Sequence, residues 1–147
     1  MVQRFDHVTF VVNDVPRAKS FFSLLGFVED KTVVISGPKF AAYMAVPGLE
    51  AEHVTLVLAD ASPRTEIQLL NYRHPATDRH VEPGDPTRHG FNHICFAVKN
   101  MEAEIERLQK HGVALLNTMM DFHSRKLVFL KGPEGIVVEL AEWNGDG

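Results

Sequence analysis

The sequence has few of the features that mark specialised classes of protein. It has a single cysteine, Cys95, so no disulfide can form within the chain, and such a composition fits a reducing compartment. Its 15 Lys and Arg against 19 Asp and Glu give a formal charge of -4, which argues against a nucleic-acid partner. No apolar run approaches the length of a membrane span, and the first residues, MVQRFDHVTF, lack the layout of a signal peptide. We therefore expect a cytoplasmic protein with no membrane or nucleic-acid partner.

What remains is the composition of an ordinary globular domain. The chain has 147 residues, of which 45% are hydrophobic and 23% charged. This length suits one domain, or two half-domains that share a core. We predict a single domain over residues 1–147.

Two stretches of the sequence repeat one another without a gap. Residues 5–27 (FDHVTFVVNDVPRAKSFFSLLGF) align with residues 91–113 (FNHICFAVKNMEAEIERLQKHGV) at an offset of 86, so that His7 falls on His93. Each stretch begins with alternating β-branched and aromatic residues, as a strand does, and continues as a capped helical pattern that ends at a glycine. The caps are Asp14 and Asn100, and the glycines are Gly26 and Gly112.

The ends of the two halves also correspond. Residues 65–72 (TEIQLLNY) align with residues 136–143 (IVVELAEW) at an offset of 71, which places Gln68 on Glu139. The first half is therefore longer by 86 − 71 = 15 residues, and we assign the excess to residues 36–50. Within this insertion the pattern indicates a short helix over 38–46 opened by its proline, although a strand fits nearly as well.

Together these correspondences predict an α+β fold of two tandem βαβββ modules that form a curved mixed sheet around a central cavity. Module one covers residues 4–72, with strands near 4–12, 28–35, 52–60 and 65–72. Module two covers residues 91–143, with strands near 91–98, 113–119, 125–131 and 136–143. Residues 73–90 hold three prolines and two glycines, and we interpret them as a linker.

Four polar residues stand at equivalent positions of the two modules, namely His7, Gln68, His93 and Glu139. Each alone is most simply a structural or surface residue, but their symmetry favours a common role if the modules pair about a pseudo-twofold axis. Two imidazoles, an amide oxygen and a carboxylate suit one divalent metal ion such as Zn, Ni, Co, Mn or Fe. Two octahedral positions would remain for water or substrate, and the metal could act as a Lewis acid on a carbonyl or enolate oxygen.

At these residues the chain resembles the vicinal oxygen chelate superfamily. The segments DHVTFVVNDVPRAKSFFSLLGF, IQLLNY, FNHICFAV and FLKGPEGIVVELAEW are similar to its four signature strands, and the resemblance covers nearly the whole chain. The superfamily includes glyoxalase I, methylmalonyl-CoA epimerase, fosfomycin-resistance transferases, extradiol dioxygenases and bleomycin-binding proteins. The resemblance implies a glyoxalase-like fold with metal ligands at the same four positions. The set His7, Gln68, His93 and Glu139 is similar to that of the epimerases.

The resemblance implies a metal-dependent lyase or isomerase that acts on a small carbonyl or enolisable substrate through a metal-bound enolate. In glyoxalase-like enzymes a metal-bound glutamate can double as the base, and here that role falls to the catalytic candidate Glu139. Gln68 cannot share it, because an amide does not accept a proton at neutral pH. Small members of the family often pair, and open sheet edges favour pairing, so we expect a homodimer.

Other reactions of the superfamily stay open. An epimerase needs proton-transfer groups on both sides of its substrate, and our alignment puts Thr55 where those enzymes carry a second glutamate. Only a shift of register would bring His53 or Glu52 there. A dioxygenase would use the two histidines and Glu139 as a facial triad. A fosfomycin-type transferase and a non-enzymatic, drug-sequestering protein of the bleomycin type are the remaining alternatives, the latter generally lacking the ligands.

Five further residues are candidates for substrate binding. Thr9 follows His7 as in the fosfomycin-resistance proteins, and Tyr43 in the insertion could form part of a lid. Phe122 and His123 precede a predicted strand and could reach the mouth of the cavity. Lys126, next to Arg125 at the start of that strand, could hold an anionic substrate.

Overall fold

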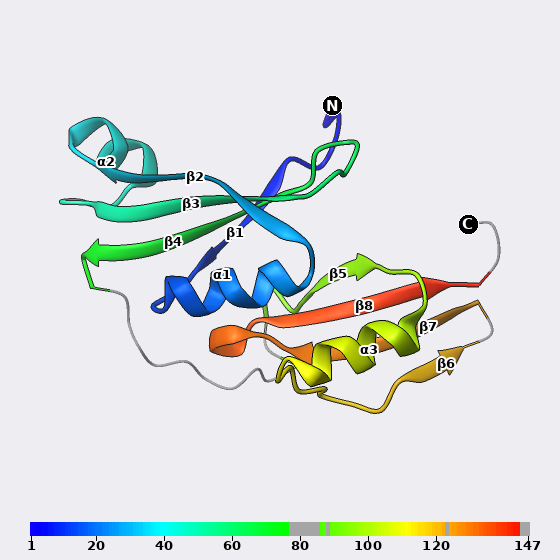
Figure 1. The fold of residues 1–147 in the computed structure, drawn as a ribbon. Helices are drawn as coiled ribbons and strands as arrows, with labels where there is room; N and C mark the ends of the chain where they lie inside the picture. The colour runs from blue at the N-terminus through cyan, green and yellow to red at the C-terminus, as the bar shows by residue number, and fades with distance from the viewer. Residues whose placement is uncertain (77–85, 88, 123, 145–147) are drawn as a thin grey trace. The chain divides into compact units, whose positions relative to one another are not determined.

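The computed structural model of the chain describes residues 1–76, 86–87, 89–122 and 124–144. It divides into two compact units, Met1–His80 and Val81–Gly147, each with one four-stranded sheet (Figure 1). The strand order is β1-β4-β3-β2 in the first unit and β5-β8-β7-β6 in the second. In both sheets the first strand pairs parallel with the last, and the other pairs are antiparallel. The predicted α+β fold of two βαβββ modules is confirmed.

The elements follow the same order in both units. The first unit contains β1 (His7–Val11), α1 (Val15–Leu24), β2 (Phe27–Ser36), α2 (Pro38–Met44), β3 (Glu50–Leu58) and β4 (Glu66–His74). The second contains β5 (Ile94–Ala97), α3 (Met101–Lys110), β6 (Met120–Phe122), β7 (Arg125–Lys131), a 3-10 turn (Pro133–Gly135) and β8 (Val137–Trp143). The insertion forms a helix, as its proline indicated. Of the predicted linker 73–90, the first two residues extend β4, and residues 77–85 and 88 lie outside the described residues.

Both long helices begin and end where the sequence predicts. The side chains of Asp14 and Asn100 each accept a hydrogen bond from the backbone N–H three residues later, at 3.0 Å and 3.4 Å. Each helix is followed by a glycine in the left-handed region, Gly26 with φ 99° and Gly112 with φ 86°. No helix in the described part of the chain is long and apolar enough to cross a membrane.

In each unit the core lies between the sheet and its long helix. Phe10 of β1 points to α1, where its ring stacks on Phe22 with 5.7 Å between centroids. In the second unit Val128 and Leu140 are fully buried on the face that carries α3. Because strand residues alternate between faces, the opposite face carries Gln68 in the first unit and Glu139 in the second. We call this the site face of each sheet.

The predicted strand at 113–119 is wrong in its extent. Only an isolated bridge between Leu115 and Leu130 forms there, and the regular pairing with β7 begins at Met120. The cause is a side chain that replaces a backbone partner, because Asn117 Oδ1 accepts the N–H of Phe129 at 2.7 Å. This contact interrupts the ladder and leaves β6 only three residues long.

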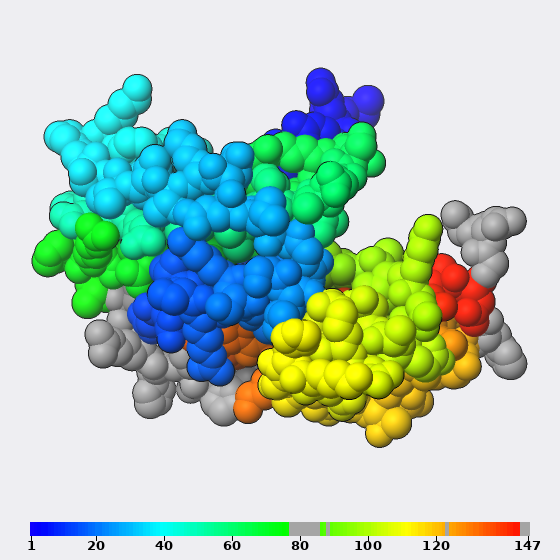
Figure 2. Space-filling model, in the orientation of Figure 1, coloured from blue at the N-terminus to red at the C-terminus, as the bar shows by residue number. Residues whose placement is uncertain are grey.

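The insertion covers one end of the site face of the first unit. Ile35, Leu49, Ala51 and Leu70 form a buried apolar cluster, against which Ala41 and Met44 pack. Ala51 and Leu70 lie two residues from His53 and Gln68 along their strands, and therefore on the same face. The outer side of α2 forms part of the surface of this unit, seen in cyan in Figure 2.

Candidate metal centre

The four predicted ligands fall into two matching pairs, one in each unit. In the first sheet Thr9 of β1 pairs with Gln68 of β4. In the second sheet Cys95, which aligns with Thr9, pairs with Glu139 of β8. Gln68 and Glu139 thus occupy equivalent positions in the two sheets.

Both histidines have one ring nitrogen held by the preceding residue. His7 Nδ1 lies 2.6 Å from Asp6 Oδ1, and His93 Nδ1 lies 2.7 Å from Asn92 Oδ1. A carboxylate can only accept, and the Asn92 amide nitrogen already donates to the Pro86 carbonyl at 3.0 Å, so each Nδ1 carries the hydrogen. This arrangement leaves Nε2 of both rings as the lone-pair donor, which is the usual way a metal-binding histidine is oriented.

The second unit brings its two predicted ligands together. His93 Nε2 lies 3.6 Å from Glu139 Oε1, and their side chains are 32% and 15% exposed. The edge-to-face contact of His93 with Phe129, at 5.1 Å between centroids, fixes the plane of the imidazole. A nitrogen and a carboxylate oxygen at this separation suit chelation of one cation, since each ligand atom would lie about 2.0–2.2 Å from the metal.

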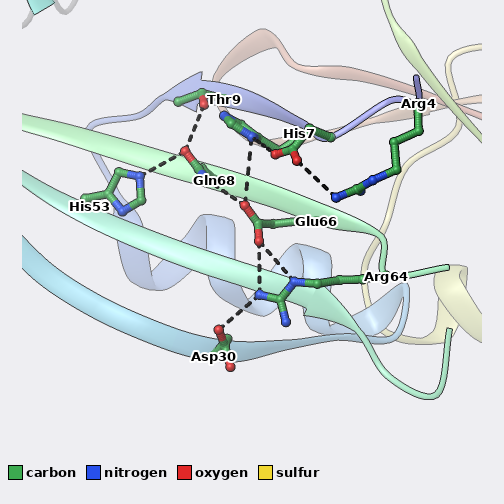
Figure 3. Close-up of polar contacts among 9 residues, drawn as sticks. Arg4, His7, Thr9, Asp30, His53, Arg64, Glu66 and Gln68 are labelled. Atoms are coloured by element: carbon green, nitrogen blue, oxygen red, sulfur yellow. Dashed lines mark hydrogen bonds and ion pairs between the residues drawn. The ribbon is translucent and has the colours of Figure 1, made fainter. Parts of the chain in front are cut away.

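In the first unit the two predicted ligands do not touch directly. Gln68 Nε2 donates to Glu66 Oε2 at 2.7 Å, and that oxygen is 3.9 Å from His7 Nδ1. On the other side of the amide, Gln68 Oε1 lies 2.9 Å from His53 Nε2 (Figure 3). Since a carboxylate only accepts, Glu66 determines which end of the amide is the nitrogen. The oxygen of Gln68 is therefore directed to His53.

A second possible cation site in the first unit is the cluster of Asp6, His7 and Glu66, whose potential ligand atoms lie within 4.8 Å of one another. Each carboxylate, however, already has cationic or hydrogen-bonding partners. Glu66 pairs with Arg64 at 3.0 Å, and Asp6 pairs with Arg4 at 3.5 Å. We interpret both carboxylates as groups that orient the histidine and the glutamine. Sequence reasoning did not identify Glu66, although its place two residues before Gln68 was the available signal.

Cys95 lies beside Glu139 but is not activated. Burial raises the pKa of its thiol to about 11, and the hydrogen bond and negative charge of Glu139 act in the same direction. The thiol is protonated at neutral pH, so Cys95 does not have the character of a nucleophile.

Two of the five candidate substrate-binding residues contact a predicted ligand or share a sheet face with one. Thr9 Oγ1 donates to Gln68 Oε1 at 3.3 Å. Phe122 pairs with Arg125, which in turn pairs with Trp143, and these three share the face of Glu139. Tyr43 is 83% exposed on α2 and is absent from the apolar cluster under that helix. His123 lies outside the described residues.

Lys126 lies on the other face of the second sheet. It pairs with Glu142 in the β7–β8 ladder, and its Nζ contacts Glu102 of α3 at 2.6 Å. The ion pair raises the pKa of Lys126 and ties β7 to the helix. The structure thus places Lys126 away from Glu139, whereas its neighbour Arg125 points to the site face.

The four side chains fit a divalent cation by the chemistry of their donors. Two imidazoles present Nε2, Glu139 presents a carboxylate, and Gln68 presents an amide oxygen whose direction is set by its neighbours. Such a mixed nitrogen and oxygen set suits first-row transition metals.

The chain matches the model of the Glyoxalase/Bleomycin resistance protein/Dioxygenase superfamily over residues 4–140. It is 26% identical to a lactoylglutathione lyase from Pseudomonas putida, over 94% of this chain and 84% of that protein. It is also 26% identical to an ethylmalonyl-CoA/methylmalonyl-CoA epimerase from Cereibacter sphaeroides, over 97% of this chain and 99% of that protein. A match to glyoxalase I of Saccharomyces cerevisiae, at 30% identity, spans 48% of this chain and only 22% of that longer protein.

Solved structures share the fold. A glyoxalase family protein from Bacillus cereus superposes with a TM-score of 0.87 at 25% identity, covering 99% of this chain and 97% of that one. The fosfomycin resistance protein of Listeria monocytogenes superposes with a TM-score of 0.64 at 15% identity, covering 98% and 96%. With the family match extending over both units, the chain belongs to the Glyoxalase/Bleomycin resistance protein/Dioxygenase superfamily.

Proposed function

We propose that this protein is a metal-dependent lyase or isomerase of the glyoxalase type, which moves a proton at the carbon next to a carbonyl group of a small-molecule substrate. One observation carries the proposal. His93 Nε2 lies beside the Glu139 carboxylate, and the aligned His7 has its Nδ1 held in the same way, which leaves its Nε2 available. The two relatives that align along most of their length, a lyase and an epimerase, support the same class of chemistry.

In this proposal His7, Gln68, His93 and Glu139 hold one divalent cation, and both units act as one functional domain. The donor set accommodates Zn, Ni, Co, Mn or Fe. When bound, the cation supplies Lewis acidity to the carbonyl oxygen of the substrate. Asp6 and Asn92 keep the imidazoles oriented, and Glu66 and His53 keep the Gln68 amide oriented.

Glu139 is the proton carrier in this scheme. Its carboxylate can take a proton from carbon and return it, whereas the amide of Gln68 cannot, and the Cys95 thiol is protonated at neutral pH. The side chain of Glu139 is 15% exposed, so little water surrounds the group that transfers the proton.

Epimerisation is the second candidate, and the end-to-end alignment with an epimerase favours it. An epimerase needs a proton-transfer group on each side of the substrate carbon. Thr55, at the position where the alignment predicted the second group, pairs with Gln68 and is 8% exposed. A threonine hydroxyl is a poor base, and for that reason we place the one-sided reaction first.

The test is metal-dependent exchange of a substrate proton with solvent. Protein stripped by a chelator and reloaded with each of the five metals is incubated in deuterium oxide with S-lactoylglutathione or with methylmalonyl-CoA, and deuterium uptake is followed by mass spectrometry. We expect uptake into one of them, lost on chelation and restored by metal. A protein that binds none of the metals, or that exchanges equally well without them, contradicts the proposal.

The proposed enzyme is a cytoplasmic homodimer. β1 and β2 are the edges of the first sheet and β5 and β6 those of the second, and unpaired edges of this kind are commonly covered by association. We expect light scattering at micromolar concentration to give twice the 16.5 kDa mass of the chain. A monomeric mass would contradict this assembly.

His53 is predicted to strengthen metal binding through Gln68. His53→Leu removes the N–H that lies 2.9 Å from Gln68 Oε1, which frees the amide to turn, and we expect the affinity for Co²⁺ to fall about tenfold. His53→Gln keeps a donor and is expected to restore both the affinity and the visible absorption spectrum of the bound Co²⁺. Equal affinity and identical spectra in His53→Leu and the unaltered protein would show that the contact is dispensable.

A further inference from the structure

A row of three side chains crosses the second sheet beyond Glu139. Phe122 of β6 pairs with Arg125 of β7, and Arg125 pairs with Trp143 of β8. Trp143 lies four residues after Glu139 along β8, so the row is on the site face. The guanidinium carbon of Arg125 lies 5.0 Å from the centre of the Trp143 ring. We call Phe122, Arg125 and Trp143 the Arg125 row.

Both aromatic members of the Arg125 row are open to solvent. Phe122 is 49% exposed and Trp143 is 54% exposed. The two rings flank Arg125 on one sheet face, so a ligand could meet an aromatic surface on either side of the guanidinium.

The equivalent row of the first unit is closed by protein. The same register there aligns Ile35, Ala51 and Tyr72 across β2, β3 and β4. Ala51 is fully buried and Ile35 is 7% exposed, because α2 packs over them. In the second unit β6 leads directly to β7, and the described residues include no counterpart of α2. The space that the insertion fills in one unit is thus left available at the Arg125 row in the other.

Of the two cations at the start of β7, Arg125 and Lys126, only Lys126 is paired with a carboxylate among the described residues. Among the described residues no Asp or Glu forms an ion pair with it, whereas its neighbour Lys126 pairs with Glu102 on the opposite face. With its guanidinium carbon above the indole ring and no carboxylate partner among the described residues, Arg125 has N–H groups that can donate to a ligand. The planar guanidinium matches the geometry of a carboxylate or phosphate, to which it can donate two parallel hydrogen bonds.

We propose that the Arg125 row is a binding subsite for an anionic group, a carboxylate or a phosphate, carried by the substrate on an apolar stem. Four residues of strand separate Trp143 from Glu139, which corresponds to about 13 Å between their Cα atoms at the usual rise per residue. Resting on the proposed function for the reacting end, this inference specifies the substrate as a carbonyl compound with an anionic tail.

Trp143 is the single tryptophan of the chain, so its fluorescence reports directly on the subsite. The metal-free protein is titrated with 4-phenylbutyrate, with 4-phenylbutyl phosphate and with the neutral 4-phenylbutanamide. We expect saturable changes with at least one anion, and binding of the amide at least tenfold weaker. The tighter of the two anions identifies the group that the substrate carries.

Two neighbouring variants make the test specific. Arg125→Gln is expected to weaken binding of the preferred anion about tenfold, because a charge-assisted bidentate contact is lost. Lys126→Gln makes the same change of charge on the opposite face and is expected to alter the affinity less than twofold. Far-UV circular dichroism checks that both variants fold, and the comparison of anion with amide in the unaltered protein does not depend on either of them.

Three outcomes overturn the inference: the amide binds as tightly as the anions, Arg125→Gln binds the anion as well as the unaltered protein, or Lys126→Gln loses as much affinity as Arg125→Gln. All measurements are made without metal. Their failure therefore leaves the proposed function standing, and a failure of the metal-dependent exchange assay leaves the subsite standing.

Discussion

Replacing Glu139 by glutamine is expected to lower the rate of solvent proton exchange by about 10² to 10⁴-fold, the range that a positioned general base contributes. The variant removes the one carboxylate of the predicted ligand set and leaves an amide oxygen in its place. The second unit would then contribute a glutamine to the predicted ligand set, as the first unit does with Gln68 at the equivalent position. We therefore expect metal affinity to weaken but stay measurable.

The measurement compares deuterium uptake with metal content, determined on the same samples by mass spectrometry. Glu106→Gln is the matched control, since Glu106 is 69% exposed on α3 and pairs with the exposed Lys110, its one ion-pair partner among the described residues. The control should exchange at the rate of the unaltered protein. If Glu139→Gln retains full exchange with its metal bound, another group moves the proton and the proposed role of Glu139 is wrong.

The parts of the fold that the sequence predicted well are those set by local patterns. Asp14 and Asn100 cap their helices, and Gly26 and Gly112 end them, because each of these roles depends on a few neighbouring residues. The internal repeat then allowed the whole topology of two βαβββ modules to be predicted from these single elements.

The errors concern contacts that depend on strand register. Alternation alone does not say whether Lys126 or Arg125 shares the face of Glu139. The β7–β8 register decides this, and the tight turn after β7 sets that register, with Gly132 donating its N–H to the Ile136 carbonyl at 2.9 Å. The strand expected at 113–119 fails for a related reason, since the Asn117 side chain takes the place of a backbone partner.

The contacts of the Gln68 amide could not be predicted from the sequence, because they also depend on strand register. His53 and Glu66 reach its amide only because β3 and β4 pair with Thr55 opposite Gln68, and because Arg64 holds Glu66. A pattern of apolar and polar residues contains no information about which way an amide points. The predicted ligand positions came from the alignment of the two halves, and both these ligands and their common metal stay predictions.

Removing either histidine is expected to remove the metal and the activity together. His93→Ala deletes the Nε2 that lies 3.6 Å from Glu139 Oε1, and His7→Ala deletes its counterpart in the first unit. Loss of one of four ligands, and of a nitrogen in particular, should lower the affinity for Zn²⁺ or Co²⁺ by several orders of magnitude, as the contribution of each ligand to a chelated site requires. His111→Ala is the control, because His111 is exposed at the end of α3.

The fold should survive Glu139→Gln, His7→Ala and His93→Ala, because the apolar cores do not depend on the cation. Phe10 stacks on Phe22 in the first unit, and Val128 and Leu140 are fully buried in the second. In the absence of metal we expect the melting temperatures of the variants to stay within a few degrees of the unaltered protein, since these side chains lie outside the packed cores. Metal content and thermal unfolding are measured side by side. Should both histidine variants keep a stoichiometric cation, the metal lies elsewhere and the enzyme proposal fails with its site. The chain would then be better understood as a binding module on the glyoxalase scaffold.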